Sequence, residues 1–233
     1  RTELYQDALL DLRQQGLLYP CFCSRADLHA AQAPHASDGA YVYAGTCRDL
    51  SKSERKELSK HKIPATRIRV PNKTYAFEDK VYGPTSQNLA GSCGDFIVQR
   101  ADDVFAYQLA VVVDDADMGV TEVVRGSDLL SSTPRQLYLQ DVLGFSHPIY
   151  AHLPLLVAPD GRRLSKRNHD LDLGVLRDQG KTPEEILGFL AYCIGLAEKE
   201  EPLSAVQVAN RFSWDVLRAH RKNVVVEHFS YVL

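Results

Sequence analysis

Apolar side chains near the amino terminus recur at helical spacing between residues 2 and 15. This period predicts a helix that packs one face on a core. Gly16 follows directly, and glycine often ends a helix because it accepts a left-handed backbone. The repeating apolar positions are Leu4, Tyr5, Ala8, Leu9 and Leu12.

The period changes to two farther along the chain. Residues 66–70 and 75–79 alternate between apolar and polar side chains, which predicts two half-buried strands with a turn at Pro71 and Asn72 between them. Residues 95–100 continue this pattern. The middle of the chain is therefore predicted to be rich in strands.

Residues 105–157 alternate between helix and strand signals. An apolar run at 107–113 is followed by a buried-strand pattern at 121–124, a proline-containing helix start at 132–134 and a strand pattern at 149–156. This alternation predicts an α/β unit with a parallel sheet.

Two further segments carry strong helix-start signals. Ser51 and Glu54 fit a capping box, in which the first and fourth residues satisfy each other's backbone N–H groups. Thr182-Pro183-Glu184-Glu185 is a second strong helix start. The chain after residue 167 is predicted to be helical throughout, with Trp214 as an anchor of its core.

Composition places the chain among ordinary globular proteins. A hydrophobic content of 45% is typical of such proteins. The length of 233 residues allows one large domain or two small ones. The sequence has no apolar run of about 18 residues to span a membrane and no secretory signal, so we expect a cytoplasmic protein. Because the chain opens at Arg1 in the middle of a helical pattern, we also expect further residues before it in the natural protein.

The net charge of -3 argues against binding nucleic acid through a bulk positive field, although a local basic patch can still bind it. Two segments are rich in cations, and a solvated helix face is the favoured interpretation of each. The first contains Lys52, Arg55, Lys56, Lys60 and Lys62, and the second contains Arg218, Arg221 and Lys222.

The five cysteines are odd in number and lack a secretory context, so a disulfide framework is not expected. Cys21, Cys23 and Cys47, together with Tyr43, would give a four-coordinate zinc site of three thiolates and one phenolate. The spacing is equally compatible with three buried thiols that only pack. The alternative fourth ligands, which would supply the more usual imidazole, are His29 and His35.

A turn followed by a basic loop lies between residues 158 and 167. Pro159, Asp160 and Gly161 favour a chain reversal. The next six residues include four cations, which would suit a triphosphate because charge-assisted hydrogen bonds are strong. Taken alone, so short a motif favours a solvated basic loop. The four cations are Arg162, Arg163, Lys166 and Arg167.

Several separated motifs agree with one another, and through them the chain resembles the glutamyl-tRNA synthetase group of class I synthetases, most closely its glutamyl-Q tRNA(Asp) branch. The resemblance covers nearly all of residues 1–167. The segments that carry it are 19–25 (YPCFCSR), 43–48 (YAGTCR), 105–115 (FAYQLAVVVDD), 123–130 (VVRGSDLL), 133–136 (TPRQ) and 164–167 (LSKR).

The resemblance implies roles for individual side chains. Tyr107 and Arg125 match positions that hold glutamate, and a guanidinium fork suits a carboxylate. For Arg125 the alternative is a structural ion pair with a neighbour such as Asp128. Lys166 matches the signature-loop lysine that contacts ATP, and Ser165 beside it belongs to the same ATP-binding loop. ATP would enter with magnesium.

The resemblance also implies one structural zinc ion, held by Cys21, Cys23, Tyr43 and Cys47. Ordinary glutamyl-tRNA synthetases usually read Cys-x-His at the last two ligands, whereas here Arg48 and Asp49 follow Cys47. This departure favours the glutamyl-Q branch, whose members activate glutamate with ATP and transfer it to queuosine in the anticodon of tRNA(Asp). The alternatives are a catalytic fragment of an ordinary glutamyl-tRNA synthetase and a catalytically silent, zinc-bearing RNA-binding module.

The predicted fold class is α/β, a class I synthetase Rossmann-like catalytic domain whose first half, with its His-rich ATP motif, would precede Arg1. The chain is expected to act as a monomer, away from membranes, on glutamate, ATP and tRNA(Asp). Its predicted parts are a remnant of the first Rossmann half (1–17), a zinc-bearing α+β insertion that binds the acceptor end (18–104), the second Rossmann half (105–167) and a helical carboxyl-terminal region (168–233).

Overall fold

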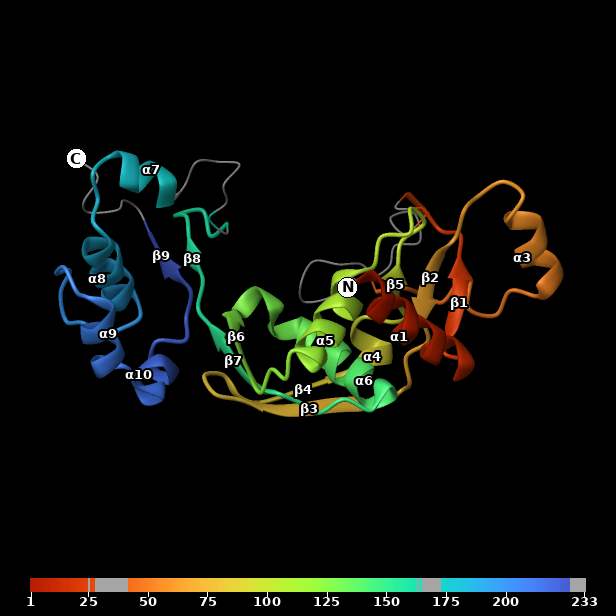
Figure 1. Cartoon of the computed structure of the whole chain (residues 1–233), viewed down its shortest axis with the longest axis horizontal. Coiled ribbons are helices and arrows are strands. Elements are labelled where there is room, and N and C mark those ends of the chain that lie inside the picture. Colours follow the sequence, from red (N-terminus) through yellow and green to blue (C-terminus); the bar gives the residue numbers. More distant parts are fainter. Residues whose placement is uncertain (25, 28–41, 163, 165–172, 227–233) are drawn as a thin grey trace. The chain divides into compact units, whose positions relative to one another are not determined.

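The computed structural model describes residues 1–24, 26–27, 42–162, 164 and 173–226 (Figure 1). Contacts divide the chain into two compact units, each assembled from separate stretches of sequence. Unit 1 consists of Arg1–Phe77, Pro84–Val123 and Leu129–Ile149, and unit 2 consists of Glu78–Gly83, Val124–Asp128 and Tyr150–Leu233.

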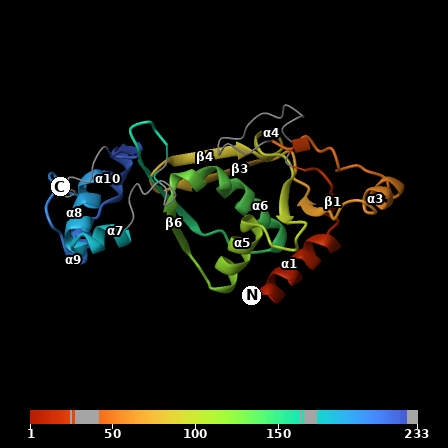
Figure 2. The same cartoon turned by 90° about the horizontal axis from the view of Figure 1, so that it is seen from above.

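Three helices pack together in unit 1. α1 (Thr2–Gln14) lies against α5 (Tyr107–Asp117) and α6 (Thr133–Leu143), as Figures 1 and 2 show. The predicted helix after Arg1 is therefore confirmed, and Gly16 follows it with a φ of 73°. The inward face of α1 buries Ala8, Leu9 and Leu12.

A three-stranded antiparallel sheet also belongs to unit 1. Its order is β1 (Leu18–Cys21), β2 (Ala65–Ile68) and β5 (Phe96–Gln99). Between β1 and β2 the capping box at Ser51 opens α3 (Lys52–Leu58), as predicted. The sheet brings the first cysteine pair, at the end of β1, beside the buried side chains of β2.

A second sheet has the order β4-β3-β7-β6. It contains β3 (Thr74–Asp79), β4 (Gly83–Asn88), β6 (Glu122–Gly126) and β7 (Ile149–Leu153). β3 and β7 run parallel, although the parallel sheet was predicted only for the strands within residues 105–157. β2 and β3, predicted as consecutive strands, belong to different sheets, because the chain at 71–72 leaves one sheet and enters the other.

Three strand predictions need correction. The strand predicted at 149–156 ends at Leu153, because Pro154 has no N–H to continue the ladder. β8 (Leu156–Val157) instead pairs in parallel with β9 (Val224–Val225), within the region predicted as all helical. β6 forms where predicted but is not buried, since Val124 is 53% exposed.

The other described elements of unit 2 are mainly helices, and the predicted helix start at Thr182 opens α8 with a capping box. Trp214 is not a core anchor: it is partly exposed and packs edge-on against Phe212, whereas Leu217 is buried. No helix among the described residues is long and apolar enough to cross a bilayer. The helices here are α7 (Leu173–Asp178), α8 (Pro183–Cys193), α9 (Ala205–Arg211) and α10 (Trp214–Ala219), and short turns elsewhere are α4 (Leu89–Ser92) and η1 (Ser127–Ser132).

Candidate functional site

The structure brings together the four predicted metal ligands of unit 1. The sulfur atoms of Cys21, Cys23 and Cys47 all lie within 4.8 Å of one another. The Tyr43 Oη lies 3.7 Å from the Cys21 Sγ and 3.9 Å from the Cys23 Sγ. The cluster forms because β1 ends at Cys21 and the turn around residues 45–48 places Cys47 beside it. All five cysteines are free thiols in the structure.

These donors fit a tetrahedral metal. Bonds of about 2.3 Å to sulfur and 2.0 Å to oxygen require neighbouring donor atoms roughly 3.5–3.8 Å apart. The Cys23 and Cys47 sulfur atoms are 3.5 Å apart, and the phenol stands at a similar distance from two thiols. Tyr43 is thus the fourth donor that the structure offers. The alternative ligands His29 and His35 lie outside the described residues.

Arg67 is a buried cation beside this cluster, with 5% of its surface exposed. Its Nε donates to the Cys21 Sγ at 3.1 Å, and its Cζ lies 3.8 Å from the centre of the Tyr43 ring. Burial raises the pKa of Cys21, but the charge and hydrogen bond of Arg67 outweigh it, so this pKa lies below its usual value. Burial, reinforced by the bond to Cys47, raises the pKa of Cys23 to about 12. A bound dication would favour the thiolate of both.

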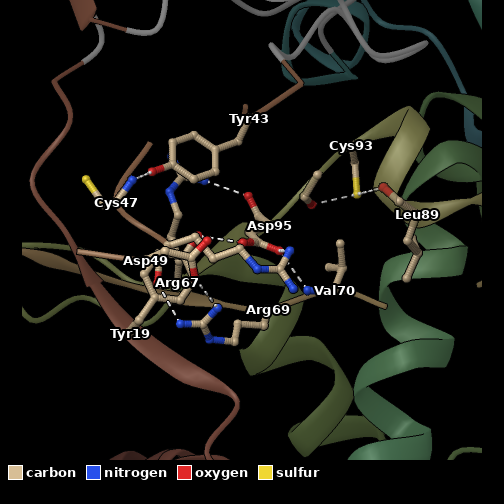
Figure 3. A network of polar contacts seen from close by, with 12 residues as sticks. Tyr19, Tyr43, Cys47, Asp49, Arg67, Arg69, Val70, Leu89, Cys93 and Asp95 are labelled. Carbon is tan, nitrogen blue, oxygen red and sulfur yellow. Dashed lines mark hydrogen bonds and ion pairs between the residues drawn. The ribbon is translucent and has the colours of Figure 1, made fainter. Parts of the chain in front are cut away.

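A second buried charge, Asp95, supports Arg67 from the position just before β5 (Figure 3). The Asp95 backbone carbonyl accepts from the Arg67 Nη1 at 2.8 Å. The carboxylate accepts from the Tyr19 hydroxyl at 2.6 Å and the Val70 N–H at 2.7 Å, and it pairs with Arg48 at 3.2 Å. These contacts fix Arg67, and through it Cys21, to the sheet.

The base of the predicted ATP loop is a defined turn in unit 2. The Gly161 N–H bonds to the Ala158 carbonyl at 2.8 Å, and the Ala158 N–H bonds to the Arg162 carbonyl at 2.9 Å. Gly161 adopts a φ of 80°, which only glycine takes without strain. The turn predicted before the loop is confirmed. The predicted ATP contacts Ser165 and Lys166 lie outside the described residues.

Tyr107, predicted to bind glutamate, is the first residue of α5 in unit 1 and is 50% exposed. The next side chain is fixed by its neighbours: the Gln108 Nε2 donates to the Ser132 Oγ at 3.0 Å, and the Gln136 Nε2 donates to the Gln108 Oε1 at 2.9 Å. The first turn of α5 therefore presents the phenol from a rigid base.

Arg125, the second predicted glutamate contact, lies on β6 in unit 2 and is half-buried. Its Nε donates to the His152 Nε2 at 2.9 Å, and the His152 Nδ1 lies 2.6 Å from the Asp79 Oδ2. Both of these partners are fully buried. Sequence reasoning missed them, although each is an ionisable residue within a predicted strand.

Residues 1–230 match the model of tRNA synthetases class I (E and Q), catalytic domain. The chain belongs to this family of class I tRNA synthetases.

Curated relatives of this class I synthetase chain are named glutamyl-Q tRNA(Asp) synthetase. The protein of Symbiobacterium thermophilum is 48% identical over 228 residues, which cover 96% of this chain and 69% of the relative. The protein of Nitratidesulfovibrio vulgaris is 47% identical over 84% of this chain and 61% of its own length. The protein of Geobacter sulfurreducens is 51% identical over 76% of this chain and 55% of its own length. The chain thus spans 55–69% of the length of these relatives.

Solved synthetase structures share the fold. The glutamate-tRNA synthetase of Elizabethkingia anophelis aligns with a TM-score of 0.75 at 22% identity, covering 97% of this chain and 51% of that one. The glutamate tRNA ligase of Elizabethkingia meningosepticum, solved with its amino acid, aligns with a TM-score of 0.73 at the same identity. The α/β synthetase catalytic fold predicted from the sequence is therefore confirmed.

Proposed function

We propose that the protein activates glutamate with ATP and transfers the glutamyl group to queuosine in the anticodon of tRNA(Asp). The observation that carries this choice within the family is the Tyr43 phenol beside three cysteine sulfur atoms, where ordinary glutamyl-tRNA synthetases usually have a histidine ligand. The names of the 47–51% identical relatives support the same choice.

Glutamate would be held by Arg125 and Tyr107. The Arg125 guanidinium can bind a carboxylate through two parallel N–H bonds, while the exposed Tyr107 phenol can donate one hydrogen bond.

Activation needs no protein nucleophile. A glutamate carboxylate oxygen attacks the α-phosphorus of ATP, the bond to the β-phosphate oxygen breaks, and magnesium pyrophosphate leaves as glutamyl adenylate forms. Negative charge moves onto the leaving phosphates in this step. Lys166 of the signature loop, with Ser165 beside it, would stabilise that charge more in the transition state than in the ground state.

Zinc, when bound, would supply a structural cross-link among Cys21, Cys23, Tyr43 and Cys47. Arg67 would offset part of the negative charge of three thiolates and would hold Cys21 in place. The segment at 18–104 that contains this site would serve as the insertion that binds tRNA. We further infer that the protein works as a monomer in the cytoplasm.

Transfer of labelled glutamate tests the proposed reaction. The intact protein is incubated with ATP, labelled glutamate and one of three RNAs: tRNA(Asp) that carries queuosine, the same tRNA with guanosine at that position, or tRNA(Glu). We expect label only on the queuosine-containing tRNA(Asp). Label on tRNA(Glu) and none on tRNA(Asp) would instead identify an ordinary glutamyl-tRNA synthetase, and a protein without any glutamate transfer would support the silent RNA-binding alternative.

A further inference from the structure

Three polar side chains form a row across adjacent strands within unit 2. Asp79 stands at the end of β3, His152 on β7 and Arg125 on β6, in the strand order β3-β7-β6. Two short contacts connect them: 2.6 Å from the Asp79 Oδ2 to the His152 Nδ1 and 2.9 Å from the His152 Nε2 to the Arg125 Nε. A buried carboxylate thus reaches a half-buried guanidinium through one imidazole.

The hydrogen-bond partners determine where the imidazole carries its proton. An arginine Nε–H can only donate, so the His152 Nε2 must accept, and the ring proton must lie on Nδ1, directed at Asp79. Asp79 is held in its turn, because its Oδ1 accepts from the N–H groups of Val81 at 3.0 Å and Tyr82 at 2.9 Å. Each hydrogen bond in this row therefore has a defined donor and a defined acceptor.

An aromatic ring holds the guanidinium from a second side. The Arg125 Cζ lies 5.3 Å from the centre of the Tyr150 ring, within the range of a cation–π contact. Tyr150 in turn stacks on His152, with ring centres 6.2 Å apart and planes 16° apart. Two residues of β7, on the same face of that strand, thus fix both the edge and the plane of the Arg125 guanidinium.

We propose that His152, oriented by Asp79, is a positioning residue that engages the Nε edge of Arg125 so that the substrate carboxylate is received by the terminal Nη1 and Nη2 nitrogens. Arginine can bind a carboxylate through its Nε edge or through its two terminal nitrogens, and the bond to His152 engages the Nε edge. This inference rests on the proposed function, in which glutamate is the ligand of Arg125.

Two substitutions of His152 separate positioning from simple support of the fold. In His152→Asn, the amide can still donate to Asp79 but offers nothing at the place of Nε2. In His152→Gln, the amide oxygen can occupy the place of Nε2 and accept from Arg125, but the link to the buried Asp79 is lost. His152→Asn therefore keeps the hydrogen bond to Asp79, and His152→Gln keeps the hydrogen bond to Arg125.

The test measures KM for glutamate and KM for ATP in ATP–pyrophosphate exchange by the intact protein, together with the melting temperature. We expect His152→Asn to raise KM for glutamate by about 10- to 100-fold, the effect of losing one hydrogen bond to a charged group, with KM for ATP unchanged. His152→Gln should stay within about 3-fold of the wild type, although it melts at a lower temperature than His152→Asn. If KM for glutamate instead follows the melting temperature, or is equal in both variants, the positioning role is wrong.

A spectroscopic measurement decides the row of contacts independently of activity. In ¹⁵N NMR of the histidine side chains, we expect His152 to carry its proton on Nδ1 and to show an unprotonated Nε2. A protonated Nε2 would overturn the proposal, whatever the substrate. A wild-type protein that shows the Nδ1–H form but no exchange with glutamate would contradict the proposed function and leave the contact between His152 and Arg125 established.

Discussion

Replacing Cys23 is the most direct way to distinguish a metal site from three thiols that only pack together. Its sulfur lies 3.5 Å from the Cys47 Sγ and 3.9 Å from the Tyr43 Oη, so a metal at this cluster would bind it. Replacing it with serine should remove zinc and loosen the segments that zinc connects. Each kcal/mol of stability lost would lower the melting temperature by roughly 2–4 °C in a chain of this size.

Elemental analysis checks this prediction. One zinc per wild-type chain and none in Cys23→Ser is the expected result, with unfolding monitored in parallel. Cys193→Ser is the matched control, since Cys193 lies in α8, in the other unit, and this variant should keep its zinc. A wild-type protein purified with no zinc would refute the four-ligand site.

Lys166 is a prediction that rests on the sequence resemblance, because it lies outside the described residues. Lys166→Ala should lower the rate of glutamate activation by about 100- to 1,000-fold, the usual loss when a group that stabilises transition-state charge is removed. Folding and zinc content should not change. Lys199→Ala is the control, since this lysine is exposed and lies 3.8 Å from Glu201. An unchanged activation rate would remove Lys166 from the mechanism.

At the level of elements, Asp79 ties the end of β3 to β7. Burial raises the pKa of Asp79, but hydrogen bonds from His152 and from the N–H groups of Tyr82 and Val81 outweigh it and leave the pKa below its usual value. The folded protein therefore favours the carboxylate. Its stabilising contribution is complete above the unfolded pKa, near 3.9, and is lost as the pH falls through the lower folded value.

Asp79→Asn should remove this dependence. At pH 7 the free energy of unfolding of this variant should be about 1.5–3 kcal/mol lower than that of the wild type, which is the usual contribution of hydrogen bonds to a charged group. The difference from the wild type should shrink as the pH falls to about 3, as measured by urea unfolding. Asp178→Asn, at an exposed carboxylate, should follow the wild type throughout. Parallel curves for the wild type and Asp79→Asn would show that this carboxylate has no part in acid sensitivity.

Helix starts could be predicted from the sequence, whereas sheet membership could not. The capping boxes at Ser51 and Thr182 depend on residues three positions apart, so the local sequence contains the whole signal. Pairing of strands depends on distant segments. β3 therefore pairs with β7, about 70 residues later, although the sequence indicates only an alternating pattern and a turn after β2.

The same distinction applies to the site. Cys21, Cys23, Tyr43 and Cys47 were found because their residue types signal metal chemistry, and the structure brings all four together. The residues that support the site were missed. Alternation within a strand assigns a side chain to a face, but it does not reveal that a charge on that face has a buried partner. Arg67, Asp79 and His152 are charges or ionisable groups of this kind.

At the scale of the whole molecule, the family and the catalytic fold are established by a match over residues 1–230 and by structural likeness over 97% of the chain. The predicted boundaries at residues 17, 104 and 167 stay predictions. The two compact units cut across them, because all four strands of the second sheet, β3, β4, β6 and β7, contribute residues to both units.

The central claim is activation of glutamate for transfer to queuosine. It is tested most directly by glutamate-dependent ATP–pyrophosphate exchange with the intact protein in the absence of tRNA, because the glutamyl-Q branch is expected to activate glutamate alone, whereas ordinary glutamyl-tRNA synthetases generally need tRNA. We expect exchange that depends on glutamate and proceeds without tRNA. Exchange that begins only when tRNA(Glu) is added would contradict it.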